Sequence, residues 1–451
     1  MGAKLTVLGI DGVPFGLLGR MVREGVMPHL AGVVEKVGVR QMRSVQPTVS
    51  SVAWSSFMTG MNPGKHGIYG FIDRAAGSWE MVLPNSRQMV VEHIWEILSK
   101  AGKRVFGMNV PVTYPPRAVN GVLIGCFLSP TVDKAAYPAA VGEYLKRINY
   151  QIDSDAQLAR QDKRAMLANL DAVLDARAEA MFHFLEQEQW DYFHTHIMGS
   201  DRLCHFLYGQ MEDGDGEFAE GFFRYFRRVD EVIGRLLEAI GEGALMVLSD
   251  HGFCRIKYEV QLSRWLVERG WTVPAAVLQS PLSIEPGKSR AYCLIPGRVF
   301  VNLAGREPGG IVPVEDYGRV REELKRDLLG MRDPQGRQVI ERVLMREEVY
   351  WPAGSAGPGA VGAQEAARAR GVFGQAADLI AVPYDGYDLK LGLAGREVFV
   401  QTALEGMHTY HDAFLVARGV ELPAGDLEIV QLARPILRHL GVEPPRDMDG
   451  V

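Results

Sequence analysis

The chain has 451 residues, more than the roughly 150 residues typical of one domain, so we expect more than one structural unit. Hydrophobic residues make up 47% of the sequence and charged residues 23%, which is ordinary for a globular protein. The net charge of -6 gives no basic footprint for a nucleic-acid polymer. The sequence contains no run of about 18 apolar residues, so we expect no membrane-spanning helix.

Apolar, strand-like runs alternate with amphipathic helices along the chain. This alternation predicts an α/β fold with a mostly parallel central sheet and helices on both of its faces. The expected strands are residues 4–10, 104–110, 121–127, 190–198, 244–249, 377–383 and 413–417. The expected helices are residues 15–24, 28–37, 90–101, 163–188, 218–240 and 427–440.

The segment 256–370 differs in texture from the rest of the chain. It combines a Gly- and Pro-containing stretch with a charged helix near 315–329 and a strand-like run at 339–344. Residues 353–369 are rich in Ala and Gly, which is typical of a surface loop. We interpret 256–370 as an inserted α+β cap between two parts of a core domain, 1–255 and 371–451, with the chain returning to the main sheet at Ala377.

Carboxylate and imidazole side chains stand where predicted strands end. Asp11 follows the first strand, and Asp250 and His251 follow the strand within ALMVLSDHG. Asp201 comes after the strand at 190–198, and His205 lies four residues later, on the same face of a helix. Because sites in open α/β sheets form outside the carboxyl ends of the strands, we expect these side chains to gather there. Such oxygen and nitrogen ligands suit Zn²⁺ or a similar divalent ion.

Each of these residues also has an ordinary structural interpretation when it is taken alone. Asp11 could cap a helix, and His205 could be a hydrogen-bonded core histidine. His194 and His196 alternate along one strand and therefore face the same side, where one could border the site and the other could belong to the core.

A candidate nucleophile lies in the segment 46–71. Ser50 and Ser51 precede an apolar helical stretch that stops at Gly60. A serine at a helix N-terminus has backbone N–H groups and the positive end of the helix dipole beside it, which suits a phosphate. Serine is also a frequent N-cap residue, and this segment alone favours the cap.

Several longer stretches carry a resemblance to a known family. The chain resembles the alkaline phosphatase superfamily, and within it the soluble prokaryotic members of the type I phosphodiesterase/nucleotide pyrophosphatase branch. The resemblance spans nearly the whole chain. The matching stretches are LGIDG at 8–12, PTVSSVAWSSFMTGMNPGKHGI at 47–68, NVPVTYPP at 109–116, GSDRLCHF at 199–206, SDHGF at 249–253 and GMHTYHDAF at 406–414.

The resemblance implies an alkaline phosphatase-like fold and two bound divalent metal ions. Zn²⁺ is the expected ion, with Mn²⁺ or Fe²⁺ as alternatives. The motifs place Ser50, rather than its neighbour Ser51, at the nucleophile position. His408 enters only through the resemblance, because the sequence around it does not distinguish it from His411. The implied ligands are Asp11, Asp250, His251 and Ser50 for one ion, and Asp201, His205 and His408 for the other.

The implied reaction is hydrolysis of a phosphoester, with diesters favoured over monoesters. Ser50 would attack phosphorus, the alcohol would leave, and the phosphoserine ester would then be hydrolysed. The expected partner is a small-molecule phosphoester, for which a nucleotide is one candidate.

The sequence departs from related patterns at two places. Ser50 is followed by neither the proline nor the arginine of the sulfatase motif, which disfavours sulfatase activity. Nucleotide pyrophosphatases place a phosphate-binding asparagine soon after the HGI segment, whereas this chain reads YGFIDR there. Arg74 and Asn109 are candidates for that phosphate contact, and Asn109 could instead make a turn or strand-end hydrogen bond.

Other functions on the same fold stay open at this stage. They are a phosphomonoesterase, a phosphomutase and a phosphonate hydrolase; a metal-binding module without turnover is a rival from another class. The N-terminus shows no signal-peptide pattern, and the four cysteines show no CxxC spacing, so a reducing cytoplasm is expected. Cys204 and Cys254 lie close in sequence to expected ligands, but small buried hydrophobes are the simpler interpretation of both.

Overall fold

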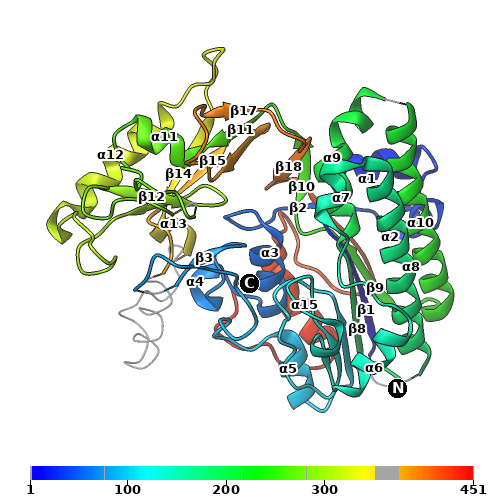
Figure 1. Ribbon diagram of the computed structural model, residues 1–451. Coiled ribbons are helices and arrows are strands. Elements are labelled where there is room, and N and C mark those ends of the chain that lie inside the picture. The colour runs from blue at the N-terminus through cyan, green and yellow to red at the C-terminus, as the bar shows by residue number, and fades with distance from the viewer. Residues whose placement is uncertain are drawn as a thin grey trace. The chain divides into compact units, whose positions relative to one another are not determined.

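A computed structural model describes residues 3–75, 77–187, 189–214, 216–280, 282–350 and 375–449. The chain divides into two units, drawn in Figure 1. The first unit comprises residues 1–62, 85–254 and 403–451. The second comprises residues 63–84 and 255–402.

The first unit is built on an eight-stranded sheet. Its five central strands are parallel, because β1 pairs in parallel with β8 and β9, and β5 pairs in parallel with β6 and β8. The outer strands β19, β2 and β7 are antiparallel to their neighbours. Across the sheet the order is β2 (Arg40–Met42), β19 (Ala413–Arg418), β9 (Ala244–Leu248), β1 (Leu5–Ile10), β8 (Tyr192–Ile197), β5 (Val105–Met108), β6 (Gly121–Ile124) and β7 (Ala136–Tyr137).

Helices cover both faces of this sheet. The central strands are buried along their length, so alternate residues face opposite helical layers. Phe193 of β8 packs in the cluster with the long helices, whereas His194 meets Trp54 of α3. One layer contains α1 (Phe15–Arg23), α2 (Pro28–Val37), α8 (Lys163–Gln187), α9 (Gly199–Asp213) and α10 (Gly216–Ile240); the other contains α3 (Ser50–Thr59), α5 (Ile94–Lys100) and α15 (Ala433–His439) (Figure 1).

Helix α3 is buried on every side, which explains its sequence, SSVAWSSFMT. Its inner hydroxyls are satisfied within the helix: Ser55 Oγ donates to Ser51 O at 2.6 Å, and Thr59 Oγ1 donates to Ser55 O at 2.7 Å. Such back-bonding lets polar residues line a buried helix at little cost. The helix ends at Gly60, which adopts the left-handed conformation with φ of 63°.

Shorter elements complete the first unit. Strand β10 (Gly252–Arg255) follows the end of β9 and pairs with β18 (Gly406–Thr409) in a two-stranded sheet. This pairing brings the segment near residue 408 to the loop that follows β9. The remaining elements are η1 (Val132–Lys134), α6 (Ala140–Arg147), α7 (Ala156–Gln161) and η3 (Ile429–Leu432).

In the part of the second unit that the structure describes, there are three small sheets with their own apolar clusters. An antiparallel sheet runs β12 (Ala291–Leu294), β13 (Arg298–Val301), β15 (Leu379–Pro383) and β14 (Ile340–Met345). A second sheet runs β16 (Tyr387–Lys390), β11 (Tyr258–Gln261) and β17 (Phe399–Val400), and a third pairs β3 (Asp73–Arg74) with β4 (Met81–Val82). The helices among the described residues of this unit are α4 (Pro63–His66), α11 (Leu262–Glu268), η2 (Val314–Asp316), α12 (Tyr317–Leu329) and α13 (Arg346–Tyr350).

The second unit is larger than the segment 256–370 that we interpreted as a cap. It also takes in residues 63–84 and continues to Thr402. The expected return to the main sheet at Ala377 is wrong, because the strand there, β15, pairs with β13 and β14. An isolated apolar run cannot reveal which sheet it joins, so the sequence pattern could not decide this. The Ala- and Gly-rich stretch at 353–369 lies outside the described residues.

Within the described ranges, no helix is long and apolar enough to cross a membrane.

Candidate metal centre

The carboxyl ends of three neighbouring parallel strands bring the predicted ligands together. Strand β1 lies between β8 and β9, with Ile10 opposite Ile197 and Gly9 opposite Leu248. Asp11 follows β1 directly, and Asp250 and His251 follow β9 by two and three residues. Asp201 lies in the first turn of α9, which begins two residues after β8 ends. All four side chains are buried.

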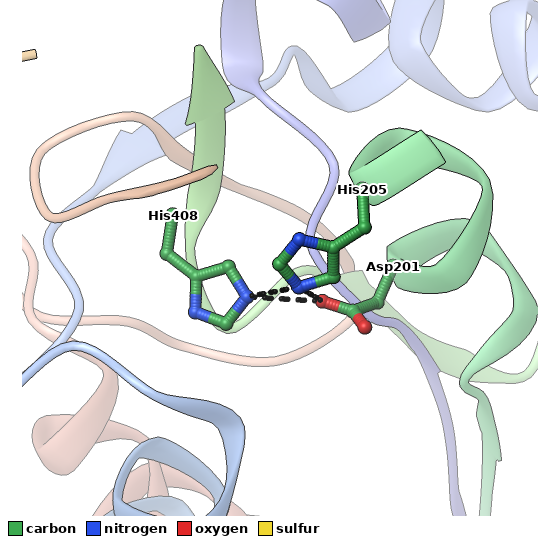
Figure 2. A group of neighbouring side chains, drawn as sticks. All are labelled: Asp201, His205 and His408. Atoms are coloured by element: carbon green, nitrogen blue, oxygen red, sulfur yellow. Dashed lines mark hydrogen bonds and ion pairs between the residues drawn. The ribbon is translucent and has the colours of Figure 1, made fainter. Parts of the chain in front are cut away.

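One cluster joins α9 to β18. Figure 2 shows Asp201 and His205, one turn apart on the helix, directed toward His408 on the strand. His408 Nε2 lies 3.1 Å from Asp201 Oδ1 and 3.0 Å from His205 Nε2, and His205 Nε2 lies 3.5 Å from Asp201 Oδ1. These three atoms lie within 4.8 Å of one another, a spacing that can hold a metal ion.

The outer ring nitrogens of the histidines indicate why a cation fits there. His205 Nδ1 lies 2.9 Å from Gly406 O, and His408 Nδ1 lies 3.4 Å from Thr48 O. A carbonyl oxygen only accepts hydrogen bonds, so each Nδ1 carries a proton, and a neutral ring of this tautomer presents an Nε2 lone pair to the cluster. Two such lone pairs 3.0 Å apart repel each other unless a positive charge lies between them. Backbone carbonyls that orient metal-binding histidines in this way are a common feature of metal sites.

A second cluster surrounds the hydroxyl of Ser50. Ser50 Oγ donates to Asp11 Oδ1 at 3.0 Å and lies 3.2 Å from His251 Nε2. His251 Nε2 lies 3.5 Å from Asp11 Oδ1 and 3.4 Å from Asp250 Oδ2, and its Nδ1 lies 3.0 Å from Gly252 O. Ligand atoms of Asp11, His251 and Asp201 also lie within 4.8 Å of one another, so Asp201 connects the two clusters.

One carboxyl oxygen of Asp250 lacks a hydrogen-bond partner in this cluster. Its Oδ1 accepts from Gly12 N at 3.2 Å, but its buried Oδ2 has no hydrogen-bond partner among the described residues. Leaving a buried carboxylate oxygen without a partner is costly, and a metal ion would remove that cost. The residues present therefore fit a divalent ion on each cluster.

Burial and mutual charge shift the pKa values of these groups strongly. Burial, together with the charge of Asp11, raises the pKa of Asp250 well above its usual range. Burial opposes ionisation of Asp11, but its contact with His196 outweighs this and lowers the Asp11 pKa. Burial and the neighbouring His408 lower the pKa of His251 to about 4, so this ring is neutral near pH 7. A neutral imidazole is the form that binds metal.

Ser50 is not the N-cap of its helix. The N-cap of α3 is Val49, and Ser50 is the first helical residue, with its hydroxyl directed at Asp11 and His251. The capping interpretation of the serine is therefore wrong. Asp11 does not cap a helix either, because the N-cap of the following helix, α1, is Pro14.

Two residues hold Asp11 from the side opposite Ser50, and the sequence did not single out their role. Trp54 Nε1 donates to Asp11 Oδ2 at 2.8 Å, and His196 Nε2 lies 2.8 Å from the same oxygen. Trp54 follows Ser50 by four residues on α3, a spacing that puts both on one helix face and could have signalled it. His196 pairs with Gly9 in the sheet, two residues before Asp11.

The two predicted substrate contacts are engaged elsewhere. Arg74 belongs to the second unit, where its guanidinium donates to Tyr292 Oη at 2.9 Å and to Ser78 O at 2.7 Å. Asn109, just after β5, donates to Ile152 O at 3.0 Å and accepts from Tyr150. A role for either in binding substrate remains a prediction, and it would require these side chains to exchange partners.

The other histidine and cysteine candidates lie at the site, in the core or on the surface. Of the two strand histidines, His196 contacts Asp11, whereas His194 stacks on Trp95 in the core. His411 is exposed, in the turn after β18. Burial and the charges of nearby aspartates raise the pKa of Cys204 well above its usual range, so it stays a thiol rather than a thiolate ligand.

Solved structures of other proteins share this fold. Phosphonoacetate hydrolase from Sinorhizobium meliloti 1021, in complex with phosphonoacetate, is similar with a TM-score of 0.63 and 18% identity over 98% of this chain and 95% of that chain. An inactive form of murine ectonucleotide pyrophosphatase/phosphodiesterase 5, in complex with AMP, is similar with a TM-score of 0.57 and 14% identity over 99% of this chain and 97% of that chain. These similarities confirm the expected alkaline phosphatase-like fold.

The sequence as a whole identifies the family. A comparison with curated proteins finds no match. The model of the type I phosphodiesterase/nucleotide pyrophosphatase family, however, matches residues 5–411, nearly the whole chain. The chain therefore belongs to the type I phosphodiesterase/nucleotide pyrophosphatase family of the alkaline phosphatase superfamily and is a metal-dependent phosphoester hydrolase.

Proposed function

We propose that the protein is a two-metal phosphodiesterase in which Ser50 is the nucleophile and a phosphoserine is the covalent intermediate. The observation that carries this proposal is the position of the Ser50 hydroxyl. It lies 3.0 Å from Asp11 Oδ1 and 3.2 Å from His251 Nε2, among the candidate ligands and at the start of a buried helix. A hydroxyl that served only to cap the helix would face the backbone N–H groups instead.

The ligands divide into two sets, consistent with the two clusters. When bound, two divalent ions would supply positive charge that lowers the pKa of the Ser50 hydroxyl and neutralises phosphate oxygens. We propose Zn²⁺, because aspartate and histidine ligands suit it; Mn²⁺ and Fe²⁺ suit the same donors. Asp11, Asp250, His251 and Ser50 would hold one ion, and Asp201, His205 and His408 the other.

The chain itself supplies placement and orientation. Ser50 is 7% exposed, so its hydroxyl approaches phosphorus from a protected position. The N-terminus of α3 lies at this hydroxyl, and a helix N-terminus favours the negative charge that a phosphate brings. Trp54 and His196 fix Asp11 from behind, so its other oxygen stays directed at Ser50. Phosphoryl transfer depends mainly on such positioning and charge stabilisation.

A hydrolysis assay with a chelator control tests this proposal. The purified chain, loaded with Zn²⁺ or Mn²⁺, should hydrolyse bis(p-nitrophenyl) phosphate faster than p-nitrophenyl phosphate. Chelation should abolish the activity, and added metal should restore it. Absence of chelator-sensitive hydrolysis of any mono-, di- or phosphonate ester would favour a metal-binding module without turnover and would contradict the proposal.

Phosphonate hydrolysis is the second candidate. The likeness to phosphonoacetate hydrolase favours it, since that structure aligns over 98% of this chain and holds phosphonoacetate. Release of inorganic phosphate from phosphonoacetate, measured beside hydrolysis of the diester at the same metal loading, would separate the two. The larger kcat/KM identifies the preferred class.

The physiological substrate we propose is a small phosphoester, with a nucleotide as the leading class. AMP bound to the murine relative supports that class. We also propose a cytoplasmic location, supported by the cysteine spacing of the sequence. Fractionation of the native host, followed by detection of the chain with a specific antibody, would test this location.

A further inference from the structure

A partly buried arginine, Arg202, adjoins the proposed ligand Asp201. Arg202 donates from Nη1 to Asp201 Oδ2 at 3.1 Å and from Nη2 to Asp153 Oδ2 at 2.8 Å. Its guanidinium also lies over the ring of Phe127, 5.4 Å from the ring centre. Two carboxylates and an aromatic face therefore fix both the position and the plane of this group.

The two oxygens of Asp201 have different partners. Oδ1 faces His408 Nε2 at 3.1 Å and His205 Nε2 at 3.5 Å, whereas Oδ2 accepts from Arg202. Without the guanidinium, either oxygen could turn toward the histidines, or both could. The arginine thus selects which oxygen points into the cluster.

Asp153, the second anchor of the arginine, is itself held in place. Its Oδ1 accepts from Ser154 N at 2.9 Å, which leaves Oδ2 for Arg202. The preceding carbonyl, Ile152 O, accepts from Asn109 Nδ2 at 3.0 Å and from the buried Arg177 Nη2 at 2.9 Å. Asn109, which the sequence offered as a phosphate contact, therefore supports the segment that carries Asp153.

The net charge of the Arg202–Asp153 pair indicates that the arginine orients Asp201 rather than neutralising it. Arg202 and Asp153 together carry no net charge, so the pair leaves the negative charge of the ligand carboxylates for the metal ions. A pair of this kind can orient Asp201 while adding no net charge beside it.

We propose that Arg202, anchored by Asp153, is a positioning residue that orients Asp201 toward the metal ion held with His205 and His408. This inference rests on the proposed two-metal site. Residues that orient ligands in this way change metal affinity by about 10- to 100-fold when they are removed.

Metal binding by purified variants tests this role directly. Zn²⁺ affinity at each site is measured by competition with a fluorescent chelator for the wild type and for Arg202→Gln. The variant should bind one ion as the wild type does and the other about 10- to 100-fold more weakly. Its hydrolytic activity should fall at limiting metal and recover at saturating metal, a rescue that a folding defect would not show.

Two further variants make the test specific. Asp153→Asn keeps Arg202 but removes the negative charge that anchors it, so this variant should weaken metal binding at the same site by a smaller factor. If Arg202→Gln fails to fold, Asp153→Asn replaces it in the test. Arg164→Gln removes an exposed arginine that pairs with Glu217 in the same unit, and it should bind both ions normally.

The outcomes distinguish the inference from the proposed function. A wild type with two ions and an Arg202→Gln variant with unchanged affinity at both sites would overturn the positioning role and leave the two-metal site standing. A folded wild type that binds fewer than two ions would overturn both.

Discussion

Each histidine of the centre is defined by the hydrogen bond on its far side. His205, His251 and His408 all place Nδ1 against a backbone carbonyl and Nε2 toward the cluster. The carbonyls come from Gly406, Gly252 and Thr48, so the chain itself sets the tautomers. Rings that are prepared in this way need no reorganisation when a metal ion binds.

The indole of Trp54 should matter through its single N–H group. Trp54→Phe keeps most of the ring but removes the donor to Asp11 Oδ2, so Asp11 retains only His196 on that side. We expect metal affinity or kcat to fall about 10- to 100-fold. Chelator competition and steady-state kinetics on the purified variant measure both quantities.

Trp95→Phe is the matched control for that variant. Trp95 is equally buried, but its indole donates to the backbone carbonyl of Phe106 at 3.3 Å. This variant should lose stability without losing metal affinity. Equal metal affinity in Trp54→Phe and the wild type would show that the indole does not hold Asp11 in a functional position.

Local sequence patterns revealed some residues of the candidate metal centre and missed others. The sequence indicated Asp250 and His251 as candidate ligands, because two side chains of metal-binding type follow a buried strand. It indicated Asp201 and His205 through their four-residue spacing. His408 could not be found in this way, because the pairing of β18 with β10 brings it in from a distant part of the chain. Arg202 looked like an ordinary helix residue, since its partner Asp153 lies 49 residues away.

The packing of β1 against α3 depends on a glycine. A Cβ atom on Gly9 would lie 2.5 Å from the ring of Trp54 and 2.9 Å from that of His196. Those are the two side chains that hold Asp11, so the bare backbone at Gly9 lets α3 and β8 approach the ligand. Gly12, with φ of 66°, serves the turn that follows, and its N–H donates to Asp250.

Gly9→Ala should therefore destabilise the protein by about 1–3 kcal/mol through overpacking. It should also weaken metal binding, because Trp54 and His196 must shift. Gly16→Ala is the control: a Cβ atom at Gly16 meets nothing within 4 Å, and alanine favours the helix α1. Urea denaturation of both variants gives the comparison, and equal stability would refute the close-packing argument.

Most elements could be predicted from sequence patterns because their apolar periodicity is strong. The expected strands at 4–10, 190–198 and 244–249 correspond to β1 and its two neighbours in the parallel sheet, β8 and β9, and the expected helix at 28–37 matches α2 in full. The edge strands β2 and β7 have only three and two residues, too few to show a pattern. The sequence also predicted a helix that starts near Ser50, but only the contacts of the Ser50 hydroxyl with Asp11 and His251 show that this serine is not the N-cap.

The first unit buries three carboxyl groups, those of Asp11, Asp201 and Asp250, at the candidate metal centre. Because Asp250 has a raised pKa in the folded chain, ionising it costs stability as pH rises, and a metal ion relieves that cost. The pKa of His251, lowered to about 4, leaves this ring already neutral above pH 5. Metal must displace a proton from Asp250 at low pH, so binding strengthens as pH rises.

The increase in Tm on adding Zn²⁺ should therefore grow between pH 5 and pH 8. Differential scanning calorimetry with and without chelator measures it, and ligand binding to the folded state alone guarantees some increase. An increase that is constant over this range, or that shrinks toward pH 8, would contradict the assignment of Asp250 as a ligand.

At the scale of the molecule, the α/β class and the presence of a second unit were predictable, whereas the boundaries of that unit were not. The second unit draws on residues 63–84 as well as 255–402, and only pairing across those segments reveals it. Within that unit, Arg298 of β13 forms an ion pair with Asp73 of β3, and no local pattern predicts a contact over 225 residues.

The most direct test of the account is the Ser50→Ala variant beside Ser51→Ala, each loaded with metal and assayed on bis(p-nitrophenyl) phosphate. We predict that Ser50→Ala folds, retains metal and loses turnover by about three orders of magnitude or more, as expected when a nucleophile is removed. Ser51→Ala should keep most of its activity. Near wild-type turnover by a metal-loaded Ser50→Ala protein would contradict the central claim that Ser50 attacks the phosphoester.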